Sequence, residues 1–331
     1  MRALLNPRLV IPTSLGLALI GTLVGVSDAG KIASTMQHLR PGFAVAFVVL
    51  MVIYEAIRGL QWHVLLEGLD VRVPLDAQAF SFLLGEATRT APIGNYFQNY
   101  LLSRVEGEDF GRTAAATTLI VLTEVGWGLL AIVVIGVDGW TWLRPLILIG
   151  LAAFLCVIVL VYHLERQVSL PRWITRHALA RTLLDELSRF RRGIAALVRP
   201  RPLTIEAALS AAYLSTAGAG LYVLAVGIGV DQLSFWQMLG IYAFSLTAGL
   251  IVPLPIDLGV VEVGGVGALV ASGLNREAAI SLMLLNRLLS VGSAIGIAAV
   301  GMLFLGDELR RALSRDRAAR PCRDRARNAP G

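Results

Sequence analysis

The chain of 331 residues is 56% hydrophobic and only 16% charged, with a formal net charge of +6. Soluble domains average about a quarter charged residues, so this composition excludes a soluble globular protein, and it is too apolar for a disordered one. Apolar blocks near the ~20 residues that a helix needs to cross a bilayer instead predict an all-α polytopic membrane protein. The excess positive charge lies in two arginine-rich segments, which favours membrane topology over nucleic-acid binding as its cause.

Three full spans and one broken segment are predicted in the first half of the chain, residues 8–137. The full spans are expected at residues 10–26, 43–62 and 113–136. A cleaved signal peptide is the alternative for the first of them. Near the end of the second, Arg58 is expected to snorkel and Trp62 to lie at the membrane interface.

The broken segment, residues 79–102, carries polar and helix-breaking residues that a lipid-facing helix would not carry. Pro92 removes a backbone donor and clashes with the preceding turn, and Gly94 follows it. Non-helical backbone at membrane depth survives only where protein or a wet cavity surrounds it. We predict two half-helices that meet at residues 92–95 as a re-entrant hairpin, and a kinked ordinary span is the alternative.

The second half, residues 142–305, is predicted to repeat this order in the opposite orientation. Full spans are expected at residues 142–163, 203–230 and 276–305. The second broken segment has its break at Pro253, Pro255 and Gly259. Two halves of opposite orientation are typical of the inverted repeats of transporters, so six full spans and two re-entrant hairpins are expected within a single membrane domain, residues 1–305.

Two arginine-rich segments predict the orientation. Residues 164–202 hold nine arginines against three acidic residues, and the tail, residues 306–331, holds eight against four. Cationic loops stay in the cytoplasm, so both termini are expected there, in a bacterial-type cytoplasmic (inner) membrane. The first segment contains an amphipathic pattern, typical of a helix at the lipid headgroups or of one packed on the bundle. The tail is expected to be disordered.

Residue types that bind metals or perform soluble enzyme chemistry form no recognisable motif. The chain has two cysteines and four histidines, and no two histidines lie at metal-ligand spacing. The chain also lacks nucleotide-binding and nucleophile-elbow motifs. We therefore expect no cofactor, no metal and no nucleic acid as a partner, and a transporter rather than an enzyme.

Three stretches carry a family resemblance. They are Arg58-Gly-Leu-Gln-Trp62 with Leu65-Leu66, Gly85-Glu86 through Pro92-Ile-Gly94, and Pro253-Leu-Pro255-Ile-Asp-Leu-Gly259-Val-Val-Glu262 followed by Asn286-Arg287. In these motifs the chain resembles the membrane region of the lysylphosphatidylglycerol synthase family, also called the flippase-like domain family, over residues 10–305. The resemblance implies paired re-entrant hairpins and movement of charged lipid across the bilayer. The soluble synthase domain of that family is not expected after residue 305.

The chain departs from the family pattern at both breaks. Asp257 stands where a small residue is usual, and residues 94–98 replace a Gly-Glu-x-x-Arg cluster. Charges at membrane depth are costly and are therefore candidates for function. Arg287 is the natural partner of Asp257 or Glu262. One interpretation is a structural ion pair with Glu262 at a helix N-terminus. The other has Arg287 binding a lipid phosphate while an acid binds a cationic headgroup or a proton.

Polar residues of the first half complete the candidate site. Glu86 and Arg89 are three residues apart and are expected to pair on one helix face, as are Glu55 and Arg58, which we interpret as structural. The predicted substrate-binding residues are Asp257, Glu262, Arg287, Asn286, Glu86, Arg89, Asn95, Gln98 and Glu124.

These observations favour a lipid flippase-like protein that moves a phospholipid, with an anionic one expected, or another charged amphiphile. Two alternatives stay open. One is a membrane-embedded lipid-modifying transferase, and the other is a non-catalytic membrane partner of a soluble synthase.

Overall fold

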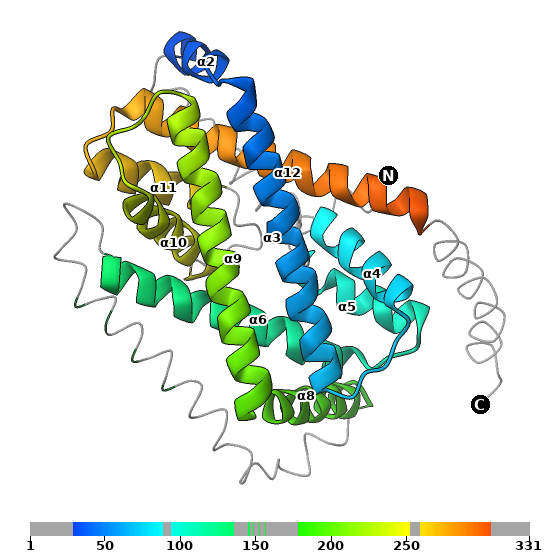
Figure 1. Ribbon diagram of the computed structural model, residues 1–331. Helices are drawn as coiled ribbons and strands as arrows, with labels where there is room; N and C mark the ends of the chain where they lie inside the picture. Colours follow the sequence, from blue (N-terminus) through cyan, green and yellow to red (C-terminus); the bar gives the residue numbers. More distant parts are fainter. Residues whose placement is uncertain are drawn as a thin grey trace.

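The computed structural model describes residues 29–88, 94–135, 178–251 and 259–305, with isolated positions between 145 and 156. Within these ranges the chain is helical and has no strand, as predicted (Figure 1). The helices are α2 (Ala29–Gln37), α3 (Pro41–Gly68), α4 (Leu75–Ala87), α5 (Gly94–Val105), α6 (Phe110–Ile135), α8 (Ala178–Leu197), α9 (Pro200–Gly227), α10 (Phe235–Ile251), α11 (Val260–Ala271) and α12 (Arg276–Phe304).

Four of these helices, α3, α6, α9 and α12, are long and apolar enough to cross a membrane. The shortest has 26 residues, about 39 Å at 1.5 Å per residue, which exceeds the ~30 Å hydrocarbon core. Both α3 and α9 begin with proline in the first turn, where its fixed φ suits a helix start. Four predicted spans are thus confirmed as helices, whereas those at residues 10–26 and 142–163 lie outside the described residues.

Each broken segment folds into two short helices that pack against each other, α4 with α5 and α10 with α11. In the first hairpin the helices approach so closely that a Cβ atom on Gly85 would lie 2.7 Å from Cβ of Gln98. A kinked single span is therefore excluded, because its two arms would not touch along their length. The predicted break residues Pro92, Pro253 and Pro255 lie outside the described residues. Gly94 is the first residue of α5.

Contacts between the two halves of the chain come in matched pairs. The long helix α6 packs on α10 of the second hairpin, and α12 packs on α4 of the first. Likewise α6 contacts α9, and α12 contacts α3. The helices α3 and α9 pack against each other along the middle of the molecule (Figure 1). The two halves are therefore interlocked rather than separate.

The pair α3–α9 is antiparallel and closely packed. Phe47 near the start of α3 lies against Gly220 near the end of α9, where an added Cβ would be 3.1 Å from the Phe47 ring. Further along, Tyr54 contacts Tyr213.

The expected interfacial positions of Arg58 and Trp62 were wrong, since the two residues are 7% and 0% exposed. The reason is that α3 continues for ten residues, about 15 Å, beyond Arg58.

The amphipathic helix α8 packs mainly on α6. Small residues allow the approach, since a Cβ on Gly193 would meet Cβ of Ala115 at 2.7 Å. Ile194 and Leu197 are buried in this contact face. On the exposed side Arg189 donates a hydrogen bond of 2.8 Å to Asp109. Of the two alternatives for this segment, the described part is packed on the bundle with arginines on its outer face.

Candidate functional site

Arg58 of α3 is the hub of a buried charge network between three helices. Its Nε donates to Glu86 of α4 at 3.1 Å, and its Nη1 donates to Glu124 of α6 at 2.7 Å. All three side chains are buried. Breaking such a pair leaves an uncompensated charge and costs about 3–5 kcal/mol. The network therefore ties α3 to α4 and α6 at membrane depth.

A fourth helix contributes an aromatic ring to Arg58. The Arg58 guanidinium carbon lies 5.2 Å from the centre of the Tyr213 ring of α9, which is a cation–π distance. The Tyr213 hydroxyl shares a hydrogen bond of 2.9 Å with the Tyr54 hydroxyl. Arg58 thus contacts groups of opposite charge on two sides and an aromatic face on a third.

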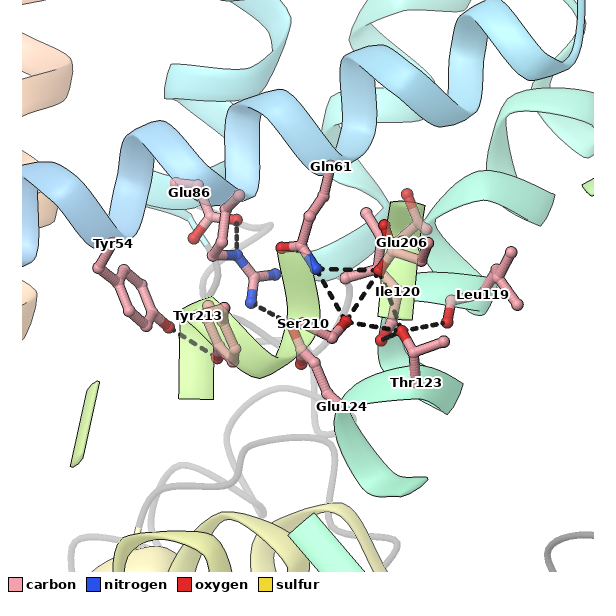
Figure 2. Close-up of polar contacts among 12 residues, drawn as sticks. Tyr54, Gln61, Glu86, Leu119, Ile120, Thr123, Glu124, Glu206, Ser210 and Tyr213 are labelled. Carbon is pink, nitrogen blue, oxygen red and sulfur yellow. Dashed lines mark hydrogen bonds and ion pairs between the residues drawn. The ribbon is translucent and has the colours of Figure 1, made fainter. Parts of the chain in front are cut away.

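A second polar cluster lies one helical turn further along α3 (Figure 2). Gln61 Nε2 donates to Glu206 Oε1 and to Ser210 Oγ, both at 2.9 Å. Thr123 Oγ1 lies 3.0 Å from the same Glu206 oxygen and 2.9 Å from Ser210 Oγ. Gln61, Glu206 and Ser210 are all 0% exposed. The cluster joins α3, α6 and α9 without any cation among these four side chains.

The site predicted from the sequence did not include Glu206, Ser210, Tyr213, Tyr54 or Gln61. A signal for them was present, because Tyr54, Arg58 and Gln61 are spaced by four and three residues, and so are Glu206, Ser210 and Tyr213. This spacing places each set on one face of its helix. A polar stripe on an otherwise apolar span must face protein or water, and the two stripes face each other.

A cavity of about 90 Å³ lies between α3, α4, α9, α10, α11 and α12. It adjoins both hairpins, since Ala87 at the end of α4 and Val261 at the start of α11 line it. Polar side chains from both halves of the chain line this cavity. The polar lining residues are Tyr54, Glu55, Glu86, Tyr242, Glu262, Asn286, Arg287 and Ser290.

Glu262 and Arg287 form an ion pair at this cavity, with Oε1 and Nε 3.3 Å apart. The other carboxylate oxygen of Glu262 accepts a hydrogen bond of 2.6 Å from the Gly259 backbone N–H. Gly259 has φ 89°, a region that favours glycine. Glu262 therefore closes the first turn of α11, where the helix dipole favours an anion, and also pairs with the predicted base.

The predicted site residues fall into three groups. Glu86, Glu262, Asn286 and Arg287 line the cavity. Glu124 is bound to Arg58, and Gln98 donates to Thr117 of α6 at 3.1 Å, so neither is part of the cavity lining. Arg89, Asp257 and the side chain of Asn95 lie outside what the structure describes. The predicted Glu86–Arg89 pair therefore stays a prediction, whereas Glu86 accepts from Arg58.

The lining of the cavity provides both charges that an amphiphile headgroup can require. Arg287 provides a planar donor for phosphate or carboxylate oxygens, and Glu55 and Glu86 provide acceptors for a cationic group. In the described ranges no three His, Cys, Asp or Glu side chains are grouped so as to hold a metal ion.

Comparison with known proteins gives one family. The model described as the lysylphosphatidylglycerol synthase TM region matches residues 13–301. A search among curated proteins gave no match. The matched range includes both hairpins, both polar stripes and the cavity.

Proposed function

This chain belongs to the family of the lysylphosphatidylglycerol synthase transmembrane region, and we propose that it is a flippase-like protein that moves a phospholipid or another charged amphiphile between leaflets. The observation that carries the proposal is the polar cavity between two helical hairpins, enclosed by helices long enough to cross a membrane. Charged groups at membrane depth are costly, and here they surround a cavity that would admit a headgroup once a hairpin moves.

The headgroup is bound in this proposal by exchange of ion-pair partners. Arg287 leaves Glu262 and binds the phosphate of an anionic lipid in bidentate fashion. Glu262 keeps its hydrogen bond from Gly259, so the acid is not left without a donor. Glu86 and Asn286 on the cavity wall accept and donate the remaining hydrogen bonds. Asp257, Arg89 and Asn95 belong to the proposed site as residues next to the two breaks.

Transport in this proposal uses an inverted repeat of six spans and two re-entrant hairpins. The matched contacts of α6 with α10 and of α12 with α4 support it, because a pseudo-two-fold axis would relate them. The cavity of about 90 Å³ is smaller than the ~300 Å³ of typical ligand pockets. The described conformation is therefore closed, and one hairpin must move away to admit a headgroup from each side in turn.

The same proposal includes the orientation. Both termini lie in the cytoplasm of a bacterial-type cytoplasmic membrane, with α8 and its outer arginines on that side. The arginine-rich face supports this placement, because cationic segments stay on the cytoplasmic side. The exposed face of α8 is also the place where a soluble synthase partner would dock.

Purified protein in liposomes that contain a labelled anionic phospholipid tests the function. We expect the wild-type chain to move the label between leaflets, and the double variant Arg287→Leu with Glu262→Leu to fold but move none. Leucine in place of both partners avoids an unpaired buried charge. The matched control, Arg189→Gln with Asp109→Asn, removes an exposed ion pair outside the cavity and should transport normally.

The assay also separates the alternatives. Chemical change of the labelled lipid would favour a lipid-modifying transferase. Neither movement nor change, by protein that is folded and inserted, would contradict the flippase and favour a non-catalytic partner. Normal movement by the double variant would exclude the Glu262–Arg287 pair as part of the translocation site.

A further inference from the structure

Glu206 is a fully buried acid in the middle of the bundle, 0% exposed. All of its described hydrogen bonds reach one oxygen, Oε1, and come from Gln61, Thr123 and Ser210. Oε2 has no hydrogen-bond partner among the described residues. An ionised carboxylate that is buried without a cation is strongly unfavourable, so the site requires a neutralising ligand.

The hydrogen bonds of the cluster favour a proton over a metal ion. Ser210 Oγ lies 3.0 Å from Glu206 Oε1 and 2.9 Å from Thr123 Oγ1, which are hydrogen-bond distances. Oxygens that share a cation such as Ca²⁺ each lie about 2.3–2.6 Å from it. Mg²⁺ binds at a shorter distance that would allow the observed spacing, but it keeps several waters. The amide N–H of Gln61 also points at Glu206 and Ser210, and a donor in that position opposes a cation and suits a carboxyl group.

The cluster can hydrogen bond Oε1 in both protonation states of Glu206 without moving a heavy atom, because hydroxyl groups donate and accept by rotation. With Glu206 ionised, Gln61, Thr123 and Ser210 all donate to Oε1. With Glu206 protonated at Oε1, that hydroxyl donates to Ser210, Ser210 donates to Thr123, and Thr123 donates to a backbone carbonyl. The last acceptor exists, since Thr123 Oγ1 lies 3.0 Å from the Leu119 oxygen and 2.9 Å from the Ile120 oxygen (Figure 2).

Among the residues that the structure describes, the charged groups around Glu206 leave no cation for it. From α6, Glu124 follows Thr123 in sequence and is the acid of the Arg58 pair. From α3, Arg58 already binds two carboxylates.

The remaining groups lie further along α9 or belong to other pairs. Tyr213 of α9 is hydrogen bonded to Tyr54. Of the helices packed further along α9, α10 contributes Tyr242, and α12 contributes Arg287, which pairs with Glu262.

We propose that Glu206 is a proton-binding site, held between α3, α6 and α9 by Gln61, Thr123 and Ser210. One proton from water converts the carboxylate to the carboxylic acid, and its release restores the charge. Proton uptake by Glu206 removes a negative charge near Glu124. It therefore changes the electrostatic field that acts on the ion pairs of Arg58 with Glu86 and Glu124. That this proton is coupled to lipid movement rests on the proposed function, whereas the site itself does not.

Infrared difference spectra of the full chain in lipid-free detergent, recorded between acidic and alkaline pH, test the site. We expect the carbonyl band of one buried carboxylic acid to appear with acid and to be lost in Glu206→Gln. Glu67→Gln, which changes an exposed acid of α3, should keep it. A band that persists in a folded Glu206→Gln protein overturns the proposal, as does a wild-type spectrum without such a band.

A second set of variants serves if Glu206→Gln does not fold. Ser210→Ala and Thr123→Val keep the acid and remove one hydroxyl each, and either should move the midpoint pH of the band. Ser215→Ala is the matched control, because the Ser215 hydroxyl bonds only the Ala211 carbonyl of its own helix in the described contacts. A midpoint unchanged in both cluster variants overturns the proposal.

Lipid movement measured across liposomes at several pH values tests the coupling separately. In Glu206→Gln we expect the rate to lose its pH dependence, and a pH profile identical to wild type overturns the coupling. If no protein moves lipid, the proposed function fails, and the infrared result still decides the proton site.

Discussion

Tyr54 of α3 and Tyr213 of α9 meet in the middle of the bundle, with hydroxyl oxygens 2.9 Å apart and ring centroids 4.6 Å apart. This contact lies in the same register of the antiparallel pair α3–α9 as the packing of Phe47 on Gly220. It places the Tyr213 ring beside Arg58 and brings Gln61 to Glu206. The same register therefore aligns the aromatic pair, the charge network and the second polar cluster.

Tyr213→Phe should lower the free energy of unfolding by about 0.5–1.5 kcal/mol, because it removes one buried hydrogen bond and keeps the ring. Tyr213→Leu should cost more, since the cation–π contact with Arg58 is lost as well. Thermal unfolding in detergent measures both. Equal melting temperatures for the two variants would show that the ring contributes nothing to holding Arg58.

Arg58→Leu should destabilise the protein by about 3–5 kcal/mol, because Glu86 and Glu124 would both stay buried without their base. The triple variant that adds Glu86→Gln and Glu124→Gln should recover most of this loss, since amides carry no charge. Chemical unfolding in detergent measures the difference. A triple variant no more stable than Arg58→Leu would mean that the network is held by something other than charge.

Gly85→Ala should weaken the first hairpin by about 1–3 kcal/mol, because its Cβ would overlap Gln98 of α5. Gly292→Ala is the matched control: Gly292 also lies within a helix, α12, and an added Cβ there meets nothing within 4 Å. The control should be neutral or stabilising by up to about 1 kcal/mol. Limited proteolysis and melting temperature compare the two, and an equal response would contradict close packing of α4 on α5.

The proposed orientation predicts opposite labelling of two loops. With Cys156 and Cys322 changed to serine, a membrane-impermeant thiol reagent added outside intact cells should reach Asp231→Cys, between α9 and α10, and should not reach Arg104→Cys at the end of α5. Both positions are exposed, so accessibility depends on the side of the membrane. Labelling of Arg104→Cys alone would overturn the orientation, and equal labelling of both would overturn the inverted repeat.

Much of the fold could be predicted because its signals are local. A run of about 20 apolar residues determines a span through the thickness of the bilayer, and four such predictions appear as α3, α6, α9 and α12. A proline or glycine break among polar residues likewise predicted two half-helices, and α4–α5 and α10–α11 have that form. A pair of Arg287 with Asp257 or Glu262 was also predicted, because both acids lie beside such a break. Arg287 is the one base in the interior of α12, whose other arginine is its first residue, and its described partner is Glu262.

The partners of Arg58 and the site at Glu206 were decided only by the tertiary structure. Sequence spacing shows which side chains share a face of one helix, so it suggested Glu55 and Arg89 as nearby partners of Arg58 and Glu86. The described contacts that this spacing could not suggest join Arg58 to Glu86 and Glu124, and Gln61 to Glu206, across 28, 66 and 145 residues of chain. Such pairs depend on how the helices are rotated about their axes and on the register of their packing. Burial can make an isolated acid costly only after several helices have enclosed it.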